Sequence, residues 1–200
     1  MNSSPHVLLP TAYLGTVSYY SLIKNTPFHT IEQHENYLKQ TIRNHCSIFG
    51  SNGTLTLTIP IHRPSGEKVR ITDVEISNID SWQRIHWQAI LSAYNSSPFF
   101  EYYEDYFRPI YETPYTRLFD FNNDLHRIVL KLLKCKSSIE FSNQYIYLDK
   151  DCDYRITKNI ANSTKLIEYY QVFAHKWGFQ KDISIIDLLC NEGPRAGEFV

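Results

Sequence analysis

The sequence of 200 residues lacks most of the patterns that assign a chemistry directly. Its four cysteines are scattered along the chain without a CxxC pair, so neither a zinc site nor a disulfide scaffold is indicated. No P-loop, GxGxxG, HExxH or nucleophile elbow is present, and the enzyme classes that depend on those motifs are disfavoured. We therefore expect no metal site, and the sequence leaves any cofactor unknown.

Long hydrophobic runs and an excess of one charge are also missing. The apolar run at residues 7–9 is too short for a signal peptide or a membrane span, and residues 1–6 carry no basic region, so we expect a cytoplasmic protein with reduced thiols. Twenty Lys and Arg balance 21 Asp and Glu for a formal charge of −1, which argues against nucleic acid as a partner. The length suits a single domain over residues 1–200.

Aromatic residues are abundant, with 15 Tyr and 11 Phe. Rings with polar tips line small-molecule and sugar pockets, although cores and interfaces use the same side chains. Residues 94–107 are the densest such stretch, and we interpret them as a connection that ends in a helical turn or two. They either pack one helix on the next or form an exposed docking surface, which would include Phe100 and Tyr103.

Residues 32–45 concentrate charged, amide and aromatic side chains. If a strand runs from about residue 39 to 46, Lys39, Thr41, Arg43 and His45 share one face. Two cations on one face indicate a nearby anion, and a ligand phosphate or carboxylate is one candidate. The acids at positions 32 and 35 are the other candidate, and solvated surface charges are a third interpretation.

The pattern of elements predicts an α+β fold with a mixed sheet. Strands are expected near residues 6–9 and 28–32 with a helix between them, and residues 39–77 read as an antiparallel meander of three strands. Later helices include one from about 113 to 134 and a short final one from 182 to 189. The strand–helix opening leaves α/β as an alternative. His86 and Asn122 fall on apolar helix faces, where we expect a hydrogen-bonded core histidine and a structural clamp.

Several segments together resemble the WbqC-like protein family. They cover most of the chain, and the last is the most specific: Pro10 to Gly15 with Tyr19, Tyr37-x-Lys39 followed by Arg43-Asn44, Leu57-Thr-Ile-Pro60, Trp82 to Tyr94, and Ile183-Ser-Ile-Ile-Asp187-Leu-Leu-x-Asn191-Glu-Gly193-Pro194. The resemblance implies a cytoplasmic bacterial role in building O-antigen or other surface-polysaccharide precursors. Acyl or aminoacyl transfer to a nucleotide-linked amino sugar is the chemistry it suggests.

Under that hypothesis the protein is a transferase with an anionic or phosphorylated small-molecule substrate. His34 or Glu35 would act as acid or base, and Lys39 and Arg43 would bind the phosphates. Tyr37 and Asn44 would orient the substrate. Tyr13 and Gly15 would contact it at the first strand-to-helix turn. A small Gly15 would let a ligand approach closely, or would serve packing alone. On this hypothesis Arg43→Ala abolishes binding and leaves the melting temperature nearly unchanged. The competing hypothesis is a non-catalytic scaffold or partner protein that docks through residues 99–107.

Overall fold

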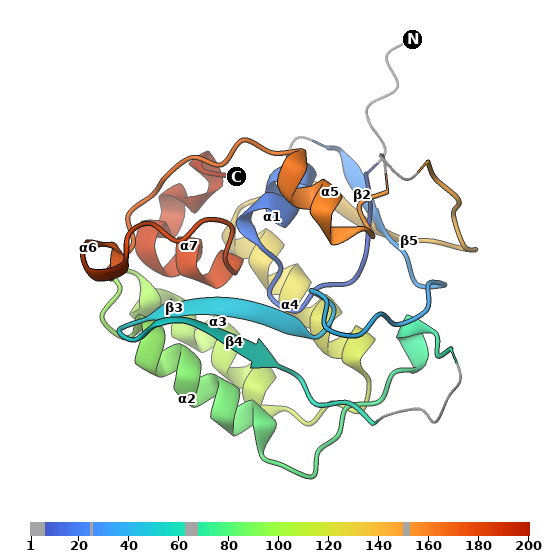
Figure 1. Ribbon diagram of the computed structural model, residues 1–200, viewed down its shortest axis with the longest axis horizontal. Helices are drawn as coiled ribbons and strands as arrows, with labels where there is room; N and C mark the ends of the chain where they lie inside the picture. Colours follow the sequence, from blue (N-terminus) through green and yellow to red (C-terminus); the bar gives the residue numbers. More distant parts are fainter. Residues whose placement is uncertain (1–6, 25, 63–67, 150–152) are drawn as a thin grey trace.

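Five strands and seven α-helices occur in the computed structural model, which describes residues 7–24, 26–62, 68–149 and 153–200 (Figure 1). Three strands form a parallel sheet in the order β1-β2-β5, with bounds β1 Val7–Leu9, β2 Phe28–Ile31 and β5 Ser138–Phe141. The last residues of the three strands lie side by side, because Ile31 pairs with both Leu9 and Phe141. The carboxyl ends of all three strands therefore meet at one edge.

A separate antiparallel hairpin joins β3 His45–Gly50 to β4 Gly53–Thr58. Its tight turn uses Gly53 at φ +96°, a backbone conformation that costs glycine little. Cys46 and Leu57 face each other across the pair and are both buried. In Figure 1 the hairpin crosses the middle of the molecule, with α2 and α3 below it and the parallel sheet at the upper right.

The helices surround these two sheets. Their bounds are α1 Val17–Lys24, α2 Trp82–Tyr94, α3 Phe100–Glu112, α4 Leu118–Leu132, α5 Thr157–Asn162, α6 Ala174–Trp177 and α7 Ile185–Glu192, with 3-10 turns η1 Ile71–Asp73 and η3 Gly193–Glu198. Helix α2 packs on β3 and α3, α4 packs on α3 and η1, and α1 contacts both α5 and α7. The α+β prediction is confirmed.

Helix α4 shows how the sequence pattern builds the core. Leu118, Phe121, Leu125 and Val129 recur at helical spacing and are all buried, so one stripe faces the interior. Asn122 lies on the same face, and its side-chain amide donates to the Arg43 carbonyl at 2.8 Å. The predicted clamp is therefore present, and it fastens α4 to the segment that follows β2. The predicted core histidine, His86 on α2, is likewise buried and hydrogen-bonded.

A buried chain of polar side chains connects β2 to α4 and to the start of β5. Thr26 donates to a backbone carbonyl of α1 and contacts Ser137 at 3.3 Å, so the Ser137 hydroxyl must donate to Thr26. His29 then donates from Nδ1 to Ser137 at 2.9 Å and accepts at Nε2 from His126 Nε2 at 2.8 Å. Tyr20 completes the chain by donating to His126 Nδ1 at 3.2 Å. Each ring nitrogen is satisfied only when both imidazoles are neutral.

Two strand predictions for residues 39–77 are wrong. Residues 39–44 form turns with Gln40 at φ +54°, and β3 begins only at His45. The shared face of Lys39, Thr41, Arg43 and His45 therefore does not exist. Residues 69–76 form η1 and isolated antiparallel bridges of Arg70 with Asn36, Glu75 with Arg117 and Ile76 with Ile61 instead of a third strand.

The aromatic stretch at residues 94–107 also differs from expectation, since α3 spans thirteen residues and ends at Glu112. The backbone N–H of Thr113, expected to open the next helix, donates to the Pro109 carbonyl and closes α3 instead. Phe100 and Tyr103 are buried in the core. These two residues are therefore not exposed docking residues, whereas Tyr102 and Tyr106 of the same stretch are exposed.

Candidate functional site

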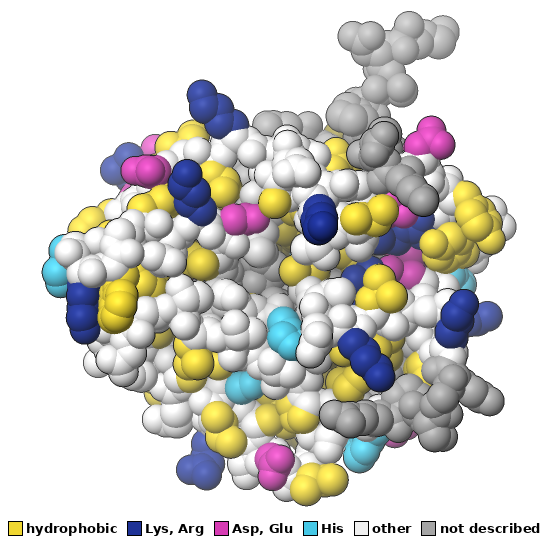
Figure 2. Space-filling view, in the orientation of Figure 1, with side chains coloured by type: hydrophobic (Ala, Val, Ile, Leu, Met, Phe, Trp, Pro, Cys, Tyr) yellow, Lys and Arg dark blue, Asp and Glu magenta, His cyan; other side chains and the backbone are white. Residues whose placement is uncertain are grey.

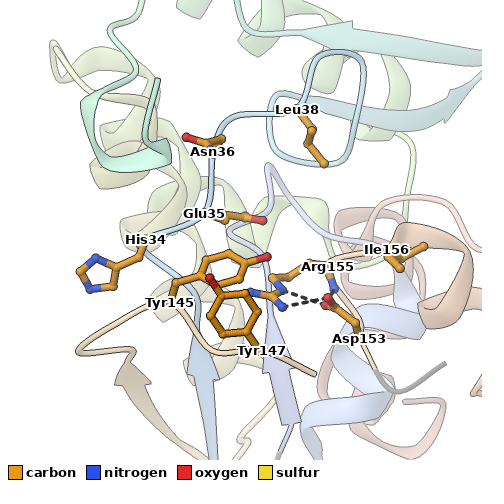
Figure 3. A pocket seen from close by; sticks show the side chains of 9 residues that line it. All are labelled: His34, Glu35, Asn36, Leu38, Tyr145, Tyr147, Asp153, Arg155 and Ile156. Carbon is orange, nitrogen blue, oxygen red and sulfur yellow. Dashed lines mark hydrogen bonds and ion pairs between the residues drawn. The ribbon is translucent and has the colours of Figure 1, made fainter. Parts of the chain in front are cut away.

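A pocket of about 550 Å³ lies where the chain leaves the parallel strands (Figure 3). One wall comes from the segment after β2 and the other from the segment after β5, because the carboxyl ends of these strands meet at one edge. The lining residues are His34, Glu35, Asn36, Leu38, Tyr145, Tyr147, Asp153, Arg155 and Ile156. Figure 2 shows hydrophobic, acidic and basic side chains meeting at the right-hand edge of the molecule, where β5 lies.

Glu32 ties the two walls together from behind the pocket. It is fully buried, and its Oε1 accepts from the His34 backbone N–H at 2.8 Å and from the Ser142 hydroxyl at 2.6 Å. Its Oε2 accepts from the Ile146 backbone N–H at 3.0 Å and from Arg155 Nη1 at 3.1 Å. Four bonds satisfy a buried carboxylate completely, so Glu32 acts as a structural link between the segments that follow β2 and β5.

Arg155 is the cation of the second wall. Its Nε and Nη2 each donate to the Asp153 carboxylate at 2.8 Å, while Nη1 reaches Glu32. Burial acts to raise the pKa of Asp153, but the hydrogen bonds from Arg155 outweigh it and the pKa is lowered. The guanidinium lies 4.5 Å from the centre of the Tyr145 ring, a cation–π contact. Asp153, Glu32 and Tyr145 therefore all contact the Arg155 guanidinium.

Arg43 and Glu35 form the second buried ion pair. The Arg43 side chain is fully buried, with Nε donating to Glu35 Oε1 at 2.8 Å and Nη2 donating to Oε2. Nη1 also donates to the Thr41 hydroxyl at 3.2 Å. Burial raises the pKa of Glu35, and the bonds from Arg43 oppose that rise without cancelling it. The anion beside Arg43 is therefore Glu35 of the same chain, as one of the alternative interpretations of this cation expected.

Two tyrosines form the aromatic part of the pocket. The rings of Tyr145 and Tyr147 contact each other edge to face at 4.9 Å between centroids. Tyr145 is 40% exposed and Tyr147 is 87% exposed. Figure 3 places both rings beside the Arg155 guanidinium. Exposed rings beside carboxylates are suited to stacking on a sugar or on a cation.

The structure brings some of the predicted site residues together. His34 and Glu35 both line the pocket, and Arg43 lies directly behind Glu35. His34 donates from Nε2 to the Ser142 carbonyl at 3.0 Å, which leaves its Nδ1 as the nitrogen with a lone pair. Lys39 is exposed and follows the pocket residue Leu38 in the chain.

The other predicted residues lie outside this pocket. Tyr37 lines a neighbouring hollow of about 190 Å³ with Val69 and Glu75. Tyr13 is buried and bonds to both His86 and Tyr111 at 2.9 Å, and the Asn44 amide donates to the Ile59 carbonyl at 3.1 Å. A Cβ on Gly15 would lie 3.0 Å from the Tyr19 ring. That close approach supports the packing interpretation of the glycine.

The second wall was missed from the sequence. Residues 145–149 and 153–156 contribute two tyrosines, an ion pair and an isoleucine, and none of these was among the candidate residues that the sequence indicated. Among the described residues, no group of three or more His, Cys, Asp or Glu is placed to hold a metal ion. The alternation Asp153-Tyr-Arg155 was the one local signal of an ion pair.

The fold and the pocket define a class: a small α+β protein with a charged and aromatic pocket at the carboxyl ends of parallel strands. A profile of the WbqC-like protein family matches residues 11–171, which include every residue that lines the pocket. The chain belongs to the WbqC-like protein family.

Among known proteins, the uncharacterized protein Rv1507c of Mycobacterium tuberculosis (strain ATCC 25618 / H37Rv) is 23% identical over 222 aligned positions, which cover 96% of each chain. No solved structure matches. In the part of the chain that the structure describes, none of the helices is both long and apolar enough to cross a membrane.

Proposed function

We propose that this protein is a cytoplasmic transferase that moves an acyl or aminoacyl group onto a nucleotide-linked amino sugar during the synthesis of a bacterial surface polysaccharide. The family supports the pathway, and the pocket after β2 and β5 supports a sugar as the ligand. One observation carries the proposal: two exposed tyrosine rings stand beside the carboxylates of Glu35 and Asp153 in a single pocket. Aromatic stacking with carboxylate acceptors for hydroxyl groups is how proteins hold sugars.

Glu35 is the residue we assign to proton transfer. An amine that arrives protonated has to lose one proton before its nitrogen can attack, and the Glu35 carboxylate is placed in the pocket to take it. The nitrogen then forms a bond to the carbonyl carbon of the donor, the bond to the leaving group breaks, and the second proton departs with that group. A base works best when its pKa approaches the working pH, and burial shifts the pKa of Glu35 in that direction. His34 Nδ1 is the alternative acceptor.

The buried cation at position 43 has a positioning role in this proposal. It holds both oxygens of Glu35 and fixes the direction of the carboxylate. We assign Lys39 to the phosphates of a nucleotide, because it is exposed and directly follows the pocket residue Leu38.

The test is a thermal-shift screen of the intact protein against a panel of nucleotide sugars, repeated with Tyr147→Ala. Ligand at one hundred times its dissociation constant adds about 2.7 kcal/mol to the free energy of unfolding. We expect a shift with at least one nucleotide sugar that is lost in Tyr147→Ala. The matched control is Tyr102→Ala, which removes an exposed tyrosine on α3 that does not line the pocket. No shift with any nucleotide sugar contradicts the proposal.

A further inference from the structure

The charged residues at the pocket do not balance. Among the residues that the structure describes, three carboxylates, from Glu32, Glu35 and Asp153, face two guanidinium groups, from Arg43 and Arg155. With all five groups ionised, the network carries one negative charge in excess. Charges in a partly buried site are screened less than surface charges, so this excess acts directly on whatever enters the pocket.

The excess negative charge lies on the pocket side of the network. The Asp153 side chain is 14% exposed, against 6% for Arg155 and none for Arg43. The Tyr145 ring also covers one face of the Arg155 guanidinium. A ligand therefore meets a carboxylate before it meets a cation.

The unused hydrogen-bonding capacity points the same way. Each carboxylate oxygen accepts about two hydrogen bonds. Glu35 Oε1 and Oε2 each accept one bond, both from Arg43, and Asp153 Oδ2 accepts one bond, from Arg155. Among the described residues, these two carboxylates thus keep three acceptor positions free. A ligand that donates hydrogen bonds fits such a lining better than one that accepts them.

We propose that the pocket selects a ligand with a protonated amino group, held between the Asp153 carboxylate and the exposed Tyr147 ring. An ammonium has three donors for the free acceptor positions and neutralises the excess charge. The open face of Tyr147 adds a cation–π contact. The inference rests on the proposed function and specifies it: the sugar enters with its amine free, and an N-acylated sugar, which lacks the charge, binds weakly and leaves.

This selection reverses the expectation of an anionic group in the pocket itself. The cation that suggested an anion site is fully paired with Glu35. A phosphate on the same ligand is compatible only outside the pocket, near the exposed Lys39. The reaction that supplies the substrate must therefore deliver a free amine, for example by transamination of a keto sugar or by deacylation of an amide.

The experiment is an NMR titration of the intact protein with four monosaccharide probes of matched ring: glucosamine, glucose, N-acetylglucosamine and glucuronate. It is run near about pH 6, below the ordinary pKa of about 7.7 for an amine next to electron-withdrawing groups. We expect glucosamine to bind about tenfold more tightly than glucose, N-acetylglucosamine to bind no better than glucose, and glucuronate to bind least.

Two variants locate the selection. Asp153→Asn should remove the preference for glucosamine over glucose, and Tyr147→Ala should weaken glucosamine severalfold. Tyr147 is 87% exposed, so its variant stays folded even if Asp153→Asn loosens Arg155. Tyr102→Ala should change neither affinity. Equal binding of glucose and glucosamine, or a preference that survives both pocket variants, overturns the inference and leaves the proposed function standing. Failure of all four probes to bind overturns the inference, and the screen against nucleotide sugars then decides the proposed function separately.

Discussion

Removing the cation at position 43 should unfold the protein more easily, which is the opposite of what a ligand-binding arginine at a surface would do. Arg43→Met leaves the Glu35 carboxylate buried without its bidentate partner. Breaking a buried ion pair by removing one partner typically costs about 3–5 kcal/mol. For a chain of this size each kcal/mol lowers the melting temperature by about 2–4 °C. We therefore expect a fall of roughly 10 °C, measured by thermal unfolding followed through tryptophan fluorescence.

The double variant separates the charge from the packing. Arg43→Met with Glu35→Met replaces the pair by apolar side chains of similar length, and buried pairs exchanged in this way often lose little stability. We expect the double variant to recover most of the stability lost by Arg43→Met. In a double-mutant cycle the two positions should show a coupling of several kcal/mol, which is typical of direct partners.

The pH dependence supplies an independent check. Arg43→Met removes the hydrogen bonds and the charge that oppose the effect of burial most strongly, so the folded-state pKa of Glu35 rises further above the unfolded value of about 4.3. A carboxyl with a raised folded pKa contributes stability that is present below the unfolded pKa and is lost as the pH rises. The loss caused by Arg43→Met should therefore be smaller near about pH 5 than near about pH 8. An unchanged melting temperature, zero coupling, or a loss independent of pH would refute this account of the ion pair.

Two further predictions concern the core. Burial lowers the pKa of His29 and of His86 to about 4, so each contributes stability that is present above about pH 6.5 and is lost as the pH falls toward about 4. Replacing either histidine with glutamine should reduce the change in the free energy of urea unfolding between about pH 6.5 and pH 4, by up to about 3 kcal/mol relative to wild type. An unchanged pH dependence would show that the ring is already charged. Gly193 has φ +56°, and a Cβ there would overlap the Phe99 ring, so Gly193→Ala should cost several kcal/mol, about as much as a large core change. The matched control is Gly178→Ala, at φ +74° with nothing within 4 Å of the new Cβ, which should cost about 1–2 kcal/mol; equal losses would show that the overlap relaxes.

Periodicity and turn chemistry were enough to predict much of the fold. The apolar stripe on α4 is a local pattern and the helix forms over it, although it begins at Leu118 instead of near residue 113. The apolar setting of His86 and Asn122 correctly indicated hydrogen-bonded core residues, because a buried polar group needs a partner whatever the fold.

The strand predicted at residues 39–46 failed for a physical reason. Alternation assigned Lys39 and Arg43 to one face, yet Arg43 turns inward to Glu35, eight residues earlier. The gain from that ion pair and the turn at Thr41, which accepts from the backbone N–H groups of Asn44 and His45, override the alternating pattern. An ion pair between residues eight positions apart leaves no mark in the alternating pattern from which a strand is predicted.

The candidate site was half visible from the sequence. His34 and Glu35 belong to one polar stretch, and both lie in the pocket, where their catalytic roles stay a prediction. The other wall comes from more than a hundred residues further along the chain. Only the parallel pairing of β2 with β5 brings Asp153 and Arg155 to the same place, and no local pattern encodes that pairing.

The pairing of β2 with β5 also determines when the pocket can form during synthesis. The chain that separates Ile31 from Ser138 closes a loop of over one hundred residues, and contacts so distant in sequence slow folding. At about 5–20 residues per second, the ribosome needs roughly 5–20 s to make that stretch. Throughout this interval one edge of β2 has no strand to pair with, and unpaired edges attract other chains. Newly made protein should therefore depend on chaperones or slow expression until residue 156 has emerged. Any truncation before residue 156 removes residues of the second pocket wall.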